Sequence, residues 1–193
     1  MDKIKEFFNS KAQNWDKESI ADGNKIKAIL NISDLTKDLK ILDVACGTGV
    51  LEEFLSDYSP KKIKAIDISE NMIKVAKEKY SNTDIEFLCE DLHNLKDETF
   101  DYIIIYNAFP HFLDQKKTIN HIYKLLVPGG TFVICHGTGR KNIDAHHKKV
   151  ASEISLGLQP AIDNAILLKD NFHIKTLIDK EDLYVIYSIK KSL

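Results

Sequence analysis

The sequence predicts an α/β fold built around a doubly wound, largely parallel sheet. Three observations lead to this prediction: short apolar runs alternate with amphipathic segments over residues 40–135, the first run ends in a glycine turn, and acidic residues follow two later runs. Strands that alternate with helices pair in parallel through right-handed crossovers. With 193 residues, 44% of them hydrophobic, the chain is long enough for one good core and too short for two. We therefore expect a single domain over residues 1–193.

Helices are expected before the first strand. Ile4, Phe7, Phe8 and Ala12 share one face at helical spacing, and residues 20–30 carry a second amphipathic pattern. From residue 40 onward the pattern changes to short apolar runs, which are typical of buried strands. These runs predict strands at residues 41–45, 63–68, 85–88, 102–106 and 131–135.

Helical segments are expected between these strands, at residues 50–55, 70–80 and 115–126. Ser69 is a favourable N-cap for the second of them. Val127-Pro128-Gly129-Gly130 ends the third, because proline and glycine do not continue a helix. The run at 102–106 is apolar throughout, which is typical of a central strand covered on both faces.

The last part of the chain is predicted to form two helices and then two strands. The helical patterns cover residues 142–158 and 161–170, and the strand patterns cover residues 172–178 and 183–189. The polar turn between the two strands is so short that it allows only an antiparallel pair.

Composition excludes several classes of protein. The formal net charge is −2, so nucleic acid is not an expected partner. No apolar stretch reaches the roughly 18–20 residues that a membrane span needs, and the N-terminus lacks the apolar core of a signal peptide. We therefore expect a cytoplasmic protein with no membrane partner. Cys46, Cys89 and Cys135 lack paired spacing, which favours reduced thiols over a disulfide framework or a zinc ribbon.

The glycine turn after the first strand is the most informative segment. Gly47 and Gly49 let the backbone turn sharply and approach a ligand where a side chain would collide. A dinucleotide-binding fingerprint would have a third glycine at position 52, but Glu52 stands there and would repel a pyrophosphate. Asp43, near the strand end, could orient the turn or meet an ammonium group through water. The segment therefore favours a zwitterionic ligand without phosphates.

Acidic residues at the next two strand ends complete a nucleoside-binding pattern. Asp67 follows the glycine turn by about 20 residues, where nucleotide-binding sheets place an acid that accepts ribose hydroxyls. Asp91 could accept from an exocyclic adenine amino group, and Ile68 and Leu92 offer apolar walls for the ring. Together these residues indicate an adenosine that carries an amino acid. Both aspartates also fit a plain structural role as helix caps.

Five motifs occur in a set order along the chain: Asp43-Val-Ala-Cys-Gly47-Thr-Gly49, Asp67, Asp91-Leu92, Phe100-Asp101-Tyr-Ile-Ile-Ile and Leu126-Val-Pro-Gly-Gly130. This ordered set, over residues 10–135, resembles the class I S-adenosylmethionine-dependent methyltransferases. The lead from Phe8 to Asp16 is similar to that of the branch that includes ubiquinone and menaquinone methylases. In that branch the lead folds over the cofactor, so residues 1–32 are expected to form a helical lid. The family implies a Rossmann-like, seven-stranded sheet of order 3-2-1-4-5-7-6 with an antiparallel last strand.

Carried over residue by residue, the resemblance implies S-adenosyl-L-methionine as the cofactor. Gly47 and Gly49 would flank its methionine part, and Asp67 would hold the ribose. Asp91 would bind adenine together with Leu92. Trp15 belongs to the expected set, although core packing explains it equally well. The expected cofactor-binding residues are Trp15, Asp43, Ala45, Gly47, Gly49, Asp67, Ile68, Asp91, Leu92 and Asn107.

Histidines are expected near the methyl acceptor. His111 follows the fourth strand and His136 the fifth, and the carboxyl ends of parallel strands share one rim. A hydroxyl, amine or thiol acceptor needs a base, so His111 or His136 is expected in that role, with Tyr106 beside them as a third catalytic residue. One alternative is a divalent metal site of His111, His136 and His147. Another is a solvated cleft lined by polar residues without a chemical role.

The acceptor is expected to be a small molecule, because no large appended domain accompanies the predicted core. Residues 138–160 are expected to form a helical insertion near it. The segment from Asn107 to Phe112 departs from the signature of enzymes that methylate nucleobases, which weakens a DNA or RNA substrate. Two other functions stay open: a non-catalytic S-adenosylmethionine-binding sensor or partner subunit, and an NAD(P)-dependent oxidoreductase, which Glu52 disfavours. We expect a monomer or a homodimer.

Overall fold

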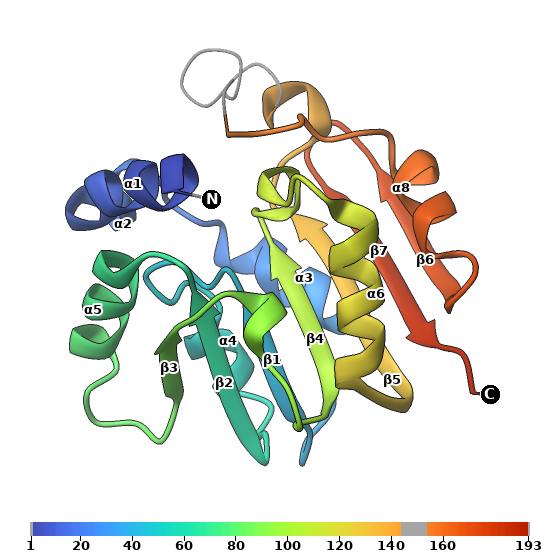
Figure 1. Ribbon diagram of the computed structural model, residues 1–193, viewed down its shortest axis with the longest axis horizontal. Coiled ribbons are helices and arrows are strands. Elements are labelled where there is room, and N and C mark those ends of the chain that lie inside the picture. The colour runs from blue at the N-terminus through green and yellow to red at the C-terminus, as the bar shows by residue number, and fades with distance from the viewer. Residues whose placement is uncertain (1, 144–153, 193) are drawn as a thin grey trace.

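A seven-stranded sheet forms the centre of the computed structural model, which describes residues 2–143 and 154–192 (Figure 1). Its strands are β1 (Lys40–Val44), β2 (Lys62–Asp67), β3 (Glu86–Cys89), β4 (Phe100–Tyr106), β5 (Leu126–His136), β6 (Phe172–Asp179) and β7 (Tyr184–Lys190). They lie in the order β3-β2-β1-β4-β5-β7-β6. The first five strands are parallel, and β7 is antiparallel to both β5 and β6. The predicted fold class, strand order and antiparallel last strand are confirmed.

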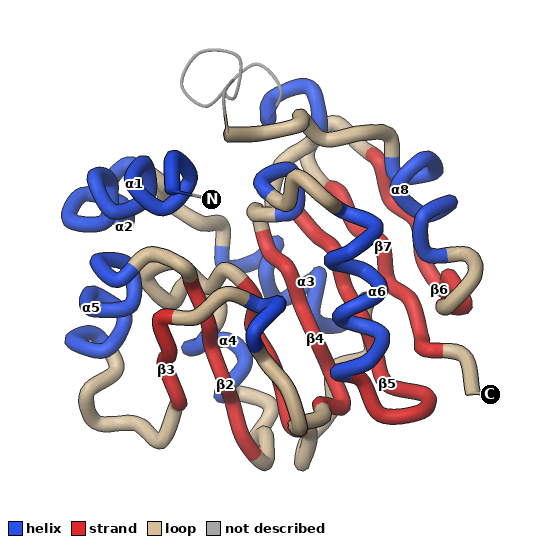
Figure 2. Tube along the Cα trace, in the orientation of Figure 1, coloured by secondary structure: helices blue, strands red, loops and turns tan. Residues whose placement is uncertain are grey.

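Helices cover both faces of the sheet (Figure 2). One face carries α3 (Gly23–Ile32), α4 (Glu52–Ser56) and α5 (Glu70–Lys79), and the other carries α6 (Gln115–Leu125) and α8 (Ala161–Leu168). Side chains of a strand alternate between faces, so Tyr102 and Ile104 in β4 pack beneath α3 while Ile103 and Ile105 pack beneath α6. Both faces of β4 are therefore buried, as predicted. Within the described ranges, no helix is both long and apolar enough to cross a membrane.

The chain changes its winding direction between β1 and β4. β1 pairs with β2 on one side and with β4 on the other, so that Asp43 lies opposite both Ala65 and Ile104. The helix after β1 covers one face and the helix after β4 covers the other. The loops that connect β1 and β4 to their helices therefore leave the sheet in opposite directions. Such a divergence opens a space at the carboxyl ends of the two strands. Ligands of open α/β sheets bind at such a switch point.

The N-terminal helices stand at the carboxyl edge of the sheet. α1 (Asp2–Lys11), η1 (Ala12–Asn14) and α2 (Trp15–Glu18) lie above α5 (Figure 1). Further short 3-10 turns are η2 (Leu92–Asn94), after β3, and η3 (Phe109–His111), after β4. The helical character predicted for the start of the chain is confirmed.

Side-chain caps fix where two of the longer helices begin. The Asp22 carboxylate accepts from the backbone N–H groups of Asn24 at 3.0 Å and Lys25 at 3.3 Å, at the start of α3. Ser69 accepts from the N–H of Met72 at 3.2 Å, at the start of α5. Such caps each stabilise a helix by about 1 kcal/mol. The N-cap role predicted for Ser69 is confirmed.

Two segments differ from the sequence-based expectation. β5 begins at Leu126 rather than Thr131, because Leu126 already pairs with Phe100 before the register shifts. The helix predicted over residues 142–158 is wrong at its C-terminal end, since residues 154–160 have no regular helix or strand. Gly157 has a φ of +73°, which a helix does not allow. Residues 144–153, in the middle of the expected insertion, lie outside the described residues.

Candidate functional site

The glycine turn leaves β1 in a conformation that few residues adopt. Ala45, Gly47 and Gly49 have φ angles of +60°, +58° and +81°. Glycine takes up this region at little cost, whereas Ala45 is strained there. The N–H of Cys46 donates to the carbonyl of Ile66 at 3.0 Å, which fastens the turn to β2. The shape of the turn is therefore set by β2 as well as by its own glycines.

Asp67, at the end of β2, holds the turn from the side. Its Oδ2 accepts from the N–H of Gly47 at 2.9 Å, and its Oδ1 accepts from the N–H of Ser69 at 2.8 Å. Burial raises the pKa of Asp67 to about 6, even though both hydrogen bonds favour the charged form. A carboxylate oxygen that accepts one hydrogen bond keeps a lone pair for another. Asp67 could therefore accept hydroxyl groups of a ligand without releasing the turn.

Asp91 occupies the equivalent place after β3. Its Oδ1 accepts from the backbone N–H of His93 at 2.9 Å and lies 3.0 Å from Nδ1 of the same residue. Both contacts fall on one oxygen, which leaves Oδ2 for a donor on a ligand. The expected apolar walls lie in different surroundings: Leu92 is buried in the main core, and Ile68 packs against the small cluster of Ile4 and Ile154. Their adenine-binding roles stay predictions.

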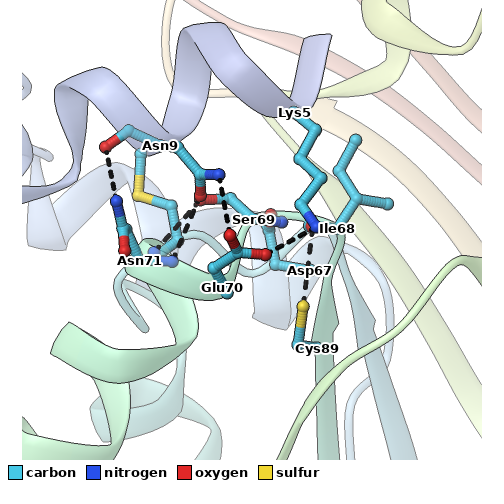
Figure 3. A network of polar contacts seen from close by, with 9 residues as sticks. Lys5, Asn9, Asp67, Ile68, Ser69, Glu70, Asn71 and Cys89 are labelled. Atoms are coloured by element: carbon cyan, nitrogen blue, oxygen red, sulfur yellow. Dashed lines mark hydrogen bonds and ion pairs between the residues drawn. The ribbon is translucent and has the colours of Figure 1, made fainter. Parts of the chain in front are cut away.

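Polar contacts tie α1 to the turn between β2 and α5, as Figure 3 shows. Oδ1 of Asn9 accepts from the Ser69 hydroxyl at 2.6 Å and from the N–H of Asn71 at 3.2 Å. The Asn9 carbonyl accepts from the Asn71 amide at 3.1 Å, and Lys5 pairs with Glu70 at 2.5 Å. Ser69, Glu70 and Asn71 follow Asp67 closely in the sequence. The lid is thus fastened beside the expected ribose site.

A second set of contacts brings the lid against the glycine turn. Nε1 of Trp15 lies 3.8 Å from the position that a Cβ on Gly47 would occupy. Asp16 accepts a hydrogen bond from the Thr48 hydroxyl and pairs with Lys79 at 3.1 Å. Trp15 therefore lies beside the glycine turn, and its site role stays a prediction.

Sequence reasoning did not single out Asn9 and Asp16, which make most of the polar contacts of the lid. Both residues lie in the lead that carries the family resemblance. Their signal was their position: Asn9 directly follows Phe8, and Asp16 directly follows Trp15.

His111 is the histidine that lies beside the lid. Its Nδ1 is 2.9 Å from the carbonyl oxygen of Ile154, and the ring of Phe8 meets it edge to face at 5.1 Å. Burial lowers the pKa of His111, so the ring is neutral at neutral pH. A carbonyl oxygen only accepts, and we therefore assign the ring proton to Nδ1 and the lone pair to Nε2. This is the protonation state of a general base.

Tyr106 and Asn107 form the end of β4. Asn107 has a φ of +54°, and its side-chain oxygen accepts from the N–H of Gly137 at 3.0 Å. A Cβ on Gly137 would lie only 2.6 Å from the Tyr106 hydroxyl, so the glycine makes room for that ring. Burial raises the pKa of Tyr106 to about 12, which keeps its phenol protonated. Tyr106 is therefore a hydrogen-bond donor rather than a base, and its catalytic role stays a prediction.

His136 lies in a different environment from His111. It is 1% exposed, at the end of β5, and its ring packs edge to face against Tyr184 at 5.7 Å. His136 is thus buried in the core while His111 lies beside the N-terminal helices, and the catalytic roles expected for both stay predictions. Among the described residues, no group of three side chains could hold a metal ion, and His147 lies outside them. The metal site stays a prediction.

Comparisons with known proteins agree with this geometry. Residues 42–134 match the methyltransferase domain family. Malonyl-[acyl-carrier protein] O-methyltransferase of Priestia megaterium is 34% identical over 137 residues, which cover 67% of this chain and 49% of that protein. Ubiquinone/menaquinone biosynthesis C-methyltransferase UbiE of Campylobacter jejuni is 32% identical over 156 residues, which cover 72% of this chain and 66% of that protein. The chain thus spans about half the length of the malonyl-[acyl-carrier protein] methyltransferases that it matches.

Solved structures share the fold. A chain from the complex between the Haloferax volcanii Trm112 methyltransferase activator and a methyltransferase has a TM-score of 0.84 at 17% identity and covers 98% of both chains. N-methyltransferase NodS of Bradyrhizobium japonicum WM9, solved with S-adenosyl-L-homocysteine, has a TM-score of 0.69 at 17% identity and covers 88% of this chain and 87% of that one. Fold and site define an α/β protein with a glycine turn and strand-end carboxylates at the switch point of its sheet. The chain belongs to the class I S-adenosylmethionine-dependent methyltransferase family.

Proposed function

We propose that this protein transfers the methyl group of S-adenosylmethionine to a small-molecule acceptor. One observation carries the proposal: Asp67 bridges the glycine turn and the β2–α5 turn, and Asn9 fastens the lid to that same β2–α5 turn. Three segments that are distant in sequence therefore converge on one site. Membership of the methyltransferase family supports S-adenosylmethionine as its ligand.

The residues present suit this cofactor. Asp67 would accept the ribose hydroxyls, Oδ2 of Asp91 would accept from the adenine amino group, and the glycine turn would pass along the methionine part. A side chain at either glycine would strain the turn, and one at Gly49 would also meet the ring of Tyr80 at 2.8 Å. Glu52 stands where a dinucleotide site would have its third glycine, which again disfavours a dinucleotide.

When bound, the cofactor supplies an activated methyl group on a sulfonium. The chain has to position the acceptor, exclude water and, where the acceptor carries a proton, remove it. Phe8 meets Trp15 edge to face at 5.7 Å and His111 edge to face at 5.1 Å, and its apolar ring would keep water from the reacting atoms. His111 would accept the acceptor's proton on Nε2 while the Ile154 carbonyl holds the ring in place.

The chemistry of His111 narrows the acceptor class. One relative is named as an O-methyltransferase and another as a C-methyltransferase. A carboxylate has no proton to lose at neutral pH, so a base beside it would have no task. A neutral His111 suits a hydroxyl group or an acidic carbon, and we propose an acceptor of that kind.

Two measurements test this function. Calorimetry with S-adenosylhomocysteine measures binding, and transfer from labelled S-adenosylmethionine to pools of small hydroxyl and carbon acids measures turnover. His111→Gln is expected to bind the cofactor with unchanged affinity. Its turnover should fall about 100-fold or more, because a general base typically contributes a rate factor of that size. Absence of binding would contradict the proposal. Binding without turnover of any acceptor would favour the sensor or partner subunit instead.

A further inference from the structure

A buried carboxyl pair lies against the glycine turn. Asp43, in β1, is 1% exposed, and Glu52, the first residue of α4, is 0% exposed. Oε2 of Glu52 lies 3.3 Å from the position that a Cβ on Gly49 would occupy. The two carboxyl groups are hydrogen-bonding neighbours once one of them carries a proton. Both therefore lie next to the backbone that we propose for the methionine part of the cofactor.

Three of the four carboxyl oxygens of this pair lack ordinary partners among the described residues. Oδ2 of Asp43 and both oxygens of Glu52 are buried and accept no hydrogen bond from the part of the chain that the structure describes. The backbone N–H groups of Leu51 and Glu52 lie close enough to the Glu52 carboxyl group to counteract part of the rise in its pKa. Neither N–H group forms a hydrogen bond with it. Two ionised carboxylates in this position would lose hydration and repel each other. One shared proton removes the repulsion and bonds the two groups together.

Neighbouring charges do not replace that proton. The titratable groups that face the pair are Asp67 on β2, Lys79 and Tyr80 on α5, Cys46 in the glycine turn and Cys135 on β5. Lys79 is the cation among them, and its Nζ already contacts Asp16 at 3.1 Å and the Thr48 carbonyl at 3.3 Å. Burial raises the pKa of Asp43 and of Glu52, the latter to about 7.

We propose that Asp43 and Glu52 hold one proton between them in the ligand-free protein and release it when the ammonium group of the cofactor reaches the glycine turn. The inference rests on the proposed function and deepens it, because it makes Glu52 a positioning residue for the amino-acid part of the cofactor. One proton passes to the solvent as one cation binds, and the ammonium group keeps its own protons. Affinity should then rise with pH, by at most about tenfold per pH unit for one proton.

Calorimetry in two buffers of different ionisation enthalpy counts the protons released on binding. With S-adenosylhomocysteine at about pH 7, the wild-type protein is expected to release a large fraction of one proton per ligand. Glu52→Gln should bind the ligand and lose most of this release, because an amide N–H then takes the place of the shared proton. Glu53→Gln is the matched control: it is the next residue of α4, it is exposed, and it should behave like the wild type.

A second ligand isolates the amino-acid part. Methylthioadenosine carries the nucleoside and a thioether but no ammonium group, so it should bind with little release from the pair. Any proton lost by Asp67 beside the ribose would be seen with both ligands. Equal release with both ligands, or unchanged release in Glu52→Gln, would overturn the inference. If Glu52→Gln does not fold, the proton release of the wild-type protein with each of the two ligands still tests the inference. Absence of binding by both would instead reject the proposed function.

Discussion

Asp67 combines a structural contact with the ribose-binding role that we propose for it. Its two oxygens accept from the N–H groups of Gly47 and Ser69 at the end of β2. Asp67→Asn is expected to weaken the binding of S-adenosylhomocysteine by roughly 1–3 kcal/mol, because an amide offers one acceptor oxygen where the carboxylate offers two. Calorimetry measures the loss. Asp84→Asn, at an exposed position before β3, is the control, and equal affinities for both variants would refute the ribose assignment.

Gly49 is required by both its backbone and its surroundings. Its φ is +81°, and a Cβ would lie 2.8 Å from the ring of Tyr80, whose hydroxyl donates to the Gly49 carbonyl at 2.8 Å. Gly129 has a similar φ of +74° but open space around it. Gly129→Ala should therefore cost only the backbone strain of about 1–2 kcal/mol. Gly49→Ala should cost more and abolish cofactor binding. Chemical denaturation of both variants checks this, and equal losses of stability would contradict it.

At the scale of elements, the lid is held by contacts rather than by its own helix propensity. α1 and α2 are short, and helices of that length are marginal on their own in water. The docking contacts come from Asn9 to the start of α5 and from Asp16 to the glycine turn. A side chain that makes these contacts is therefore expected to affect how firmly the N-terminal helices stay docked.

Asn9→Ala is expected to loosen the lid without unfolding the sheet. The variant removes the acceptor for Ser69 and Asn71, so hydrogen exchange in residues 2–18 should accelerate while the thermal midpoint of the protein changes little. Affinity for S-adenosylhomocysteine should fall about threefold to thirtyfold, which corresponds to one or two hydrogen bonds. Ser10→Ala removes only a local bond to Phe7 and serves as the control. Unchanged exchange in Asn9→Ala would show that the aromatic contacts alone hold the lid.

For the whole molecule, the buried acids link stability to pH. Burial raises the pKa of Glu52 from 4.5 to about 7 and that of Asp67 from 3.8 to about 6 in the folded protein. The folded state then binds more protons than the unfolded chain between the unfolded and folded pKa values. The contribution of these groups to the free energy of unfolding is therefore largest below the unfolded pKa and is lost as pH rises through the folded pKa.

Glu52→Gln should remove part of this pH dependence. Urea unfolding measures the free energy of unfolding at about pH 5 and about pH 7.5. Between these two pH values, that free energy is expected to fall less in Glu52→Gln than in the wild type, by roughly 1–3 kcal/mol. Glu53→Gln, exposed on the same helix, should retain the wild-type dependence. If the Glu52→Gln and wild-type stabilities fall in parallel, Glu52 is ionised in the folded state at both pH values.

Much of the fold could be predicted because it depends on local patterns. The apolar run of β4, the glycine turn and the cap at Ser69 each follow from a few neighbouring residues. The strand order required the family resemblance, since periodicity shows which face a side chain takes but not which strand lies next to it. The helix expected over residues 142–158 failed at its end because an amphipathic pattern does not show where Gly157 takes a left-handed φ.

The amino-acid pattern was enough to place carboxylates and glycines at successive strand ends, because parallel strands bring those ends to one rim. Which side chains meet there depends on how the strands and helices pack. His111 lies against the lid and His136 lies in the core, although both follow a strand in the same way. Glu52, whose place in the sequence only disfavours a dinucleotide, is buried beside Asp43. Burial and pairing depend on residues that are distant along the chain, and these set the charge and the pKa of each group.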